Sequence, residues 1–119
     1  MASINEAFEL ARLGNQRQAT EILRHEFEKL QSPGRRIDLC EWIADCFEKL
    51  QEYTQAGNWY EMAGELILAQ MGASTPAAVV NAFHEYERAL DCYERGDEVE
   101  DVERCDQILT TLRQSFASS

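Results

Sequence analysis

The chain lacks the features that mark several large classes of protein. No apolar run approaches the roughly 20 residues that a membrane-spanning helix needs, and the opening segment MASINEAFEL contains no basic stretch followed by an apolar one, as a secretory signal would. We therefore expect a cytoplasmic protein without a membrane span. Only two prolines occur among 119 residues, and 45% of the residues are hydrophobic, which predicts one ordered domain covering residues 1–119.

Motifs of metal, phosphate and nucleophile chemistry are also missing. The four cysteines form no C-x-x-C pair, and two histidines are too few to complete a zinc site at the usual spacing. Di-iron helical bundles need a glutamate three residues before each histidine, but here that position is Ile22 for His25 and Asn81 for His84. We expect no metal, no cofactor and no catalysis, and we expect the cysteines, which stand at apolar helical positions, to lie in the core.

Basic residues are scarce. The chain has 22 acidic and 11 basic residues, a net charge of −11. Acidic and basic residues balance within residues 1–40, so the excess lies in residues 41–119. Nucleic-acid binding depends on Lys and Arg contacts with phosphates, so this composition argues against it. An acidic surface favours basic partners, although the same charge also serves solubility alone.

Apolar residues recur at intervals of three and four along the whole chain, which is the helical period. Breaks at Gly14, at Ser32-Pro33-Gly34, near Leu50–Tyr53, at residues 72–76 and at Gly96 divide this pattern. The pattern predicts an all-α fold with helices over residues 3–13, 16–31, 35–50, 53–71, 76–95 and 98–116. Short links make neighbouring helices antiparallel, which gives three hairpins over about 3–31, 35–71 and 76–116.

Small and large residues alternate at fixed spacing in the middle hairpin. The positions are Ala44, Phe47, Ala56, Tyr60 and Ala63. This spacing resembles the tetratricopeptide repeat, in which helical hairpins stack into a solenoid. The resemblance implies a scaffold that binds other proteins and performs no chemistry. A plain six-helix bundle is the alternative, because many helical hairpins use small residues where helices cross.

The outer hairpins match this pattern less well. The first hairpin keeps Ala7, Leu10, Gly14, Ala19 and Leu23 at the same spacing. The third keeps Leu90, Tyr93, Val102 and Leu109, but it has Asp106 where an aromatic residue would pack, and its Gly96 comes one residue early. Gln51 stands where the family commonly has a turn glycine. Equivalent positions are 37 residues apart (Ala7 to Ala44) and then 46 (Ala44 to Leu90), against a usual 34.

Two polar stripes occupy identical offsets in the second and third hairpins. They are Asp38, Glu41, Asp45 and Glu48, and His84, Glu87, Asp91 and Glu94. The resemblance implies that the first helix of each hairpin lines a concave face. We therefore expect these residues to form a groove for a basic or amphipathic segment of a partner protein. The alternative is that they are the solvated faces of amphipathic helices.

Apolar residues at the two ends of the chain offer further surfaces. Ile4 and Phe8 take the equivalent offsets in the first hairpin, so the groove would begin with an apolar end. In the last helix, one apolar seam is predicted to cover the preceding helix; its members are Val102, Cys105, Leu109, Leu112 and Phe116. The alternative function is a self-associating helical-bundle protein, a homodimer with a structural role that uses one of these surfaces.

Overall fold

The computed structural model describes residues 3–71 and 75–117, apart from the side chains of residues 71, 116 and 117. The described residues form six helices: α1 (Ile4–Arg12), α2 (Gln16–Lys29), α3 (Pro33–Lys49), α4 (Tyr53–Met71), α5 (Pro76–Arg95) and α6 (Val99–Ala117). The all-α prediction is confirmed, and each predicted boundary lies within two residues of the observed one. The predicted break after α4 falls partly outside the described residues, at 72–74.

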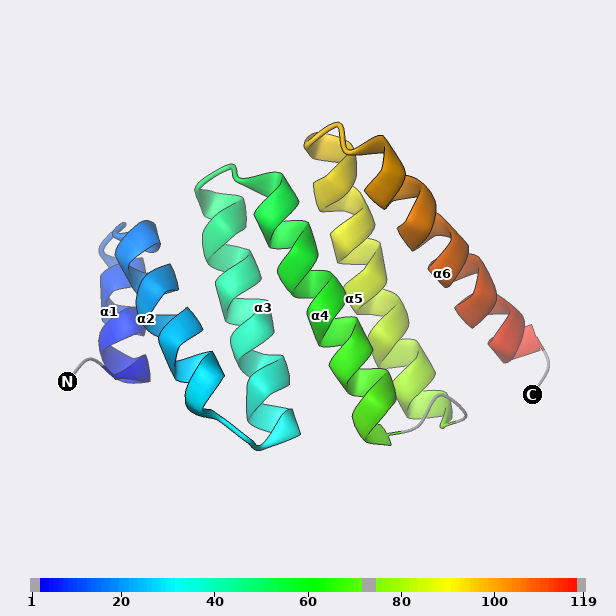
Figure 1. Ribbon diagram of the computed structural model, residues 1–119, viewed down its shortest axis with the longest axis horizontal. Coiled ribbons are helices and arrows are strands. Elements are labelled where there is room, and N and C mark those ends of the chain that lie inside the picture. Colours follow the sequence, from blue (N-terminus) through cyan, green and yellow to red (C-terminus); the bar gives the residue numbers. More distant parts are fainter. Residues whose placement is uncertain (1–2, 72–74, 118–119) are drawn as a thin grey trace.

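The helices follow one another along the long axis of the molecule, with the two termini at opposite ends (Figure 1). The Cα atoms extend over 48 × 32 × 19 Å. Each helix packs mainly against its neighbours in the chain, from α1 on α2 through to α5 on α6. A compact bundle would bring the first and last helices together, so this arrangement is that of a solenoid of helical hairpins.

The turns inside the three hairpins share one backbone conformation. Gly14, Gln51 and Asp97 have φ angles of 93°, 61° and 57°. In each turn, the N–H of the next residue donates to a carbonyl five residues back, at 2.8 to 3.0 Å, which is the Schellman pattern. In the third turn, Asp97 takes the left-handed conformation and Gly96 does not. Gly96 comes one residue earlier than the turn glycine of the repeat, but the third turn has the same backbone geometry as the other two because Asp97 takes the left-handed conformation.

Contacts between successive hairpins also repeat. The guanidinium of Arg17, three residues after the first left-handed residue, donates to Glu52 Oε1 at 2.8 Å. The hydroxyl of Thr54, three residues after the second, donates to Glu98 Oε1 at 3.0 Å. Both acceptors come one residue after the left-handed residue of the next turn. The hairpins are thus stacked with the same offset, although their spacing in sequence differs.

The residues of the repeat-like motif pack the core. Ala44, Ala56 and Ala63 are fully buried, and the large Phe47 and Tyr60 nearly so. Two glycines bring α4 closest to α5: a Cβ at Gly57 or Gly64 would lie 2.7 Å from the ring of Tyr93 or Tyr86, respectively. The motif therefore describes how the helices pack together.

All four cysteines are buried, as predicted, and their thiols are free. Burial raises the pKa of Cys40, Cys92 and Cys105 to about 12 and also raises that of Cys46. Because the thiolate is the reactive species, we expect Ellman's reagent to modify the folded protein at least about 100-fold more slowly than the unfolded one. All four thiols should react in concentrated guanidinium chloride. Rapid modification of any thiol in native buffer would contradict this burial.

Candidate interaction groove

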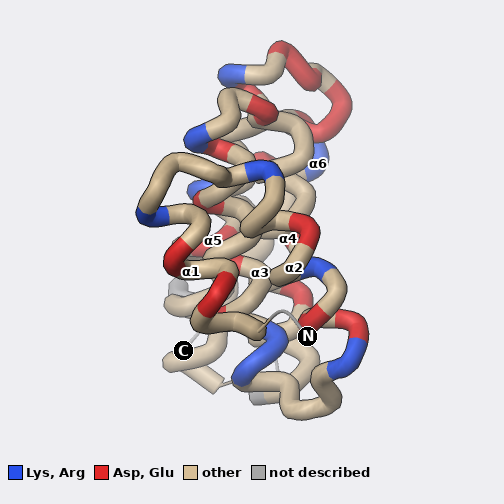
Figure 2. Tube along the Cα trace, turned by 90° about the vertical axis from the view of Figure 1, so that its left-hand side faces the viewer, with Lys and Arg blue, Asp and Glu red and all other residues tan. Residues whose placement is uncertain are grey.

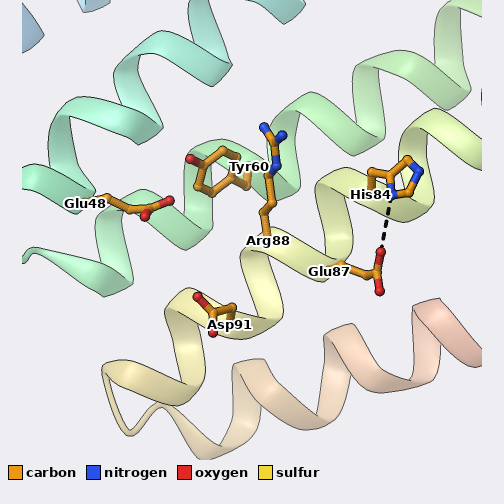
Figure 3. Close-up of a pocket in the computed structure, with 6 residues that line it drawn as sticks. All are labelled: Glu48, Tyr60, His84, Glu87, Arg88 and Asp91. Carbon is orange, nitrogen blue, oxygen red and sulfur yellow. Dashed lines mark hydrogen bonds and ion pairs between the residues drawn. The ribbon is translucent and has the colours of Figure 1, made fainter.

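An open hollow of about 440 Å³ lies where α3, α4 and α5 meet, and we call it the acidic pocket. It is lined by Glu48 of α3, Tyr60 of α4, and His84, Glu87, Arg88 and Asp91 of α5 (Figure 3). The imidazole of His84 lies 3.3 Å from the carboxylate of Glu87. Four residues of the two predicted stripes therefore meet around one cavity.

Arg88 lies in the acidic pocket and was not predicted as a site residue. Its Nη1 atom is 3.7 Å from Glu41 Oε2 and 3.8 Å from Glu85 Oε1, and its guanidinium carbon is 5.8 Å from the ring centroid of Tyr60. Both distances to the carboxylates exceed that of a hydrogen bond. Arg88 thus offsets part of the negative charge around the acidic pocket, but it forms no close ion pair with either carboxylate.

Glu85 lies one helical turn before Arg88 and is buried, with 4% of its surface exposed. Its Oε2 atom has no hydrogen-bond partner among the described residues. Burial, then the charge of Glu41, raises the pKa of Glu85 to about 7, while Arg88 opposes the rise. Sequence analysis missed this residue, although its spacing from the buried Ala82 and Ala89 marks a carboxylate on the core face.

Aromatic side chains form a second hollow between α1 and α3, which we call the apolar pocket. The rings of Phe8 and Trp42 meet edge to face with centroids 4.6 Å apart, yet each residue remains 39% exposed. The pocket holds about 240 Å³ and is lined by Phe8, Ala11, Arg12, Leu23, Trp42, Asp45, Cys46 and Lys49. Phe8, a predicted partner-binding residue, thus lines a cavity together with Trp42, which was not predicted as a site residue.

The other predicted site residues lie around these pockets. Asp38 and Ile4 line a smaller hollow of about 170 Å³ that also touches Trp42. Asp45 lies on the apolar pocket and forms an ion pair with Lys49 at 3.0 Å. Glu41 contacts Arg88, and Glu94 is exposed on α5 outside the acidic pocket. The stripe on α3 is thus divided between the α1 side and the α5 side.

Much of the acidic excess lies outside the groove. The densest acidic segment runs from the turn between α5 and α6 into the first turn of α6, at the top of Figure 2; its members are Asp97, Glu98, Glu100 and Asp101. Net charge alone therefore does not locate the site. The acidic pocket differs from that segment because its three carboxylates, from α3 and α5, line one cavity.

The described residues contain no group of three or more His, Cys, Asp or Glu side chains placed to hold a metal ion. None of the described helices is long and apolar enough to cross a membrane. The comparison with protein-family models found no match, and the comparison with curated proteins found no similar sequence. The resemblance to tetratricopeptide repeats therefore rests on the packing motif and on the repeated hairpin geometry.

Proposed function

We propose that this chain is a non-catalytic interaction module, a scaffold or adaptor that binds a basic or amphipathic segment of a partner protein along α1, α3 and α5. The observation that carries the proposal is the acidic pocket, which is lined by the carboxylates of Glu48, Glu87 and Asp91. Within the chain, Asp91 forms an ion pair with Arg95 at 3.3 Å, the imidazole of His84 lies beside Glu87, and Arg88 contributes one guanidinium to the lining. A Lys or Arg side chain from a partner would supply the remaining positive charge.

The pocket offers a cation two kinds of contact. Carboxylates accept charge-assisted hydrogen bonds, which are stronger than neutral ones. Tyr60 presents an aromatic ring to the cavity, and the position of Arg88 near that ring supports a cation–π contact there. The net charge of −11 on the free protein would also speed the approach of a basic segment.

Contacts within the chain favour this proposal over self-association through α6. The side chains of Cys105, Leu109 and Leu112 are buried, and Val102 and Ile108 pack partly buried against the same core. The described part of the seam is thus used in packing, while the side chain of Phe116 lies outside the described residues. A homodimer remains the alternative function, and light scattering would distinguish it from a monomer.

Peptide selection tests the proposed function. We expect a displayed library of random peptides about 16 residues long, selected on the whole protein, to yield peptides enriched in Arg and Lys. A selected peptide should lose at least about tenfold in affinity for the Glu87→Lys/Asp91→Lys variant, because two pocket carboxylates become cations. Fluorescence anisotropy of the labelled peptide measures this change.

A matched control separates the pocket from overall charge. The variant Glu103→Lys/Asp106→Lys makes the same change in net charge at two exposed positions of α6. It should bind the selected peptide within about twofold of the wild type. Equal losses in both variants, or selected peptides without basic residues, would contradict the proposed groove.

A further inference from the structure

The apolar pocket and the acidic pocket occupy equivalent places at two successive hairpin junctions. Positions can be counted from the left-handed residues of the turns, Gly14, Gln51 and Asp97. Four lining positions then coincide: Ala11 with Glu48, Leu23 with Tyr60, Trp42 with Arg88, and Asp45 with Asp91. The groove therefore contains the same cavity twice, one hairpin apart.

The two cavities differ in chemistry at three of the four shared positions. The first has Ala11, Leu23 and Trp42 where the second has charged or hydroxylated side chains. Phe8 adds a further aromatic face to the first cavity. The cations Arg12 and Lys49 also line it, but Arg12 pairs with Glu9 and Lys49 with Asp45. The first cavity thus offers apolar walls and no unpaired carboxylate, so it suits an apolar side chain, whereas the second suits a cation.

The separation of the cavities sets the spacing of the side chains that could fill both. The rings of Phe8 and Trp42 touch, so side chains of α1 and α3 meet across the apolar pocket; helices in direct contact pack about 10 Å apart. One hairpin step along the groove is of the same order. A partner helix rises 1.5 Å per residue, so about seven residues, or two turns on one face, span that distance.

We propose that the groove binds one amphipathic helix of a partner protein through two anchors. A large apolar side chain enters the apolar pocket, and an Arg or Lys about seven residues away enters the acidic pocket. The difference between the two pockets fixes the direction, since the apolar anchor suits the pocket between α1 and α3 and the basic anchor suits the pocket beside α5. This inference rests on the proposed function and adds the side-chain pattern of the partner.

Selected peptides test the pattern directly. The enriched sequences should share a large apolar residue about seven positions from a basic one. A synthetic peptide with that pattern should lose about tenfold in affinity for Trp42→Ala and for Phe8→Ala, because each removes one aromatic wall. The control Met62→Ala removes a side chain of similar exposure on α4 and should leave affinity unchanged. Circular dichroism confirms that each variant is folded.

The outcomes separate this inference from the proposed function. If Trp42→Ala and Phe8→Ala bind the peptide like the wild type while Glu87→Lys/Asp91→Lys does not, the two-anchor pattern is overturned and the acidic groove stands. Enriched peptides that are basic but have no apolar residue at fixed spacing would also overturn the two-anchor pattern alone. If Glu87→Lys/Asp91→Lys also binds normally, the proposed function itself is wrong.

Discussion

Replacing Tyr93 with alanine is expected to lower the free energy of unfolding by about 4 kcal/mol. Tyr93 is fully buried, and its ring lies against the backbone of Gly57, where even a Cβ would not fit. Its hydroxyl lies 2.6 Å from Asn58 Oδ1 and 2.8 Å from Glu61 Oε1. The substitution opens a large cavity and removes this donor at once. Urea unfolding followed by circular dichroism measures the loss.

The variant Tyr93→Phe separates the ring from the hydroxyl. It keeps the packing and removes only the hydrogen bonds, so a loss of about 1–2 kcal/mol is expected. Glu61 retains its contacts with Arg104, at 2.9 Å to Nε and 2.7 Å to Nη2. Equal losses for the two variants would mean that the hydroxyl, and not the ring, dominates. A loss below about 1 kcal/mol for Tyr93→Ala would contradict the packing described here.

The network around Glu61 connects three helices. Burial tends to raise the pKa of Glu61, but the hydrogen bonds from Arg104 and Tyr93 together outweigh it and lower that pKa. Glu61 belongs to α4, Tyr93 to α5 and Arg104 to α6. These contacts therefore stabilise the third hairpin against the second, where the spacing in sequence departs most from the usual repeat.

The fold could be predicted from the sequence because helical periodicity and breaks act locally. Pro33 and Pro76 each begin a helix, as their missing N–H and fixed φ favour. The turn at Gly96 and Asp97 shows the limit of this reasoning. Both residues tolerate a left-handed backbone, and from the sequence alone the glycine is the expected left-handed residue. The hydrogen-bond register selected Asp97, because the N–H of Glu98 must reach the carbonyl of Tyr93.

The candidate site was harder to predict because it depends on the contacts of neighbouring helices. The spacing of the four acidic residues on α3 predicts a single continuous surface, but α3 lies between α1 and α5. Asp38 and Asp45 therefore face hollows on the α1 side, whereas Glu41 and Glu48 face α5. Trp42 and Arg88 lie beside the stripes, at equivalent positions, and only the stacking of hairpins shows that they line cavities.

The buried carboxyl of Glu85 is expected to make stability fall as the pH rises. Its pKa is raised from 4.5 to about 7 in the folded protein, so between these values the native state binds more protons than the unfolded one. The contribution of Glu85 to the free energy of unfolding is fully present below pH 4.5 and is lost as the pH rises through 7. The loss between pH 5 and pH 8 is about 2 to 3 kcal/mol, and urea unfolding at the two pH values measures it.

The variant Glu85→Gln isolates this contribution, since glutamine resembles the protonated carboxyl and does not titrate. Relative to the wild type, it should be more stable at pH 8 than at pH 5 by the same amount, about 2 to 3 kcal/mol. The control Glu94→Gln changes an exposed carboxylate of the same helix and should differ from the wild type by less than about 0.5 kcal/mol at either pH. A constant difference between Glu85→Gln and the wild type would mean that Glu85 is already ionised at pH 5. Arg88 would then have to neutralise Glu85, and less of its charge would offset the carboxylates of the acidic pocket.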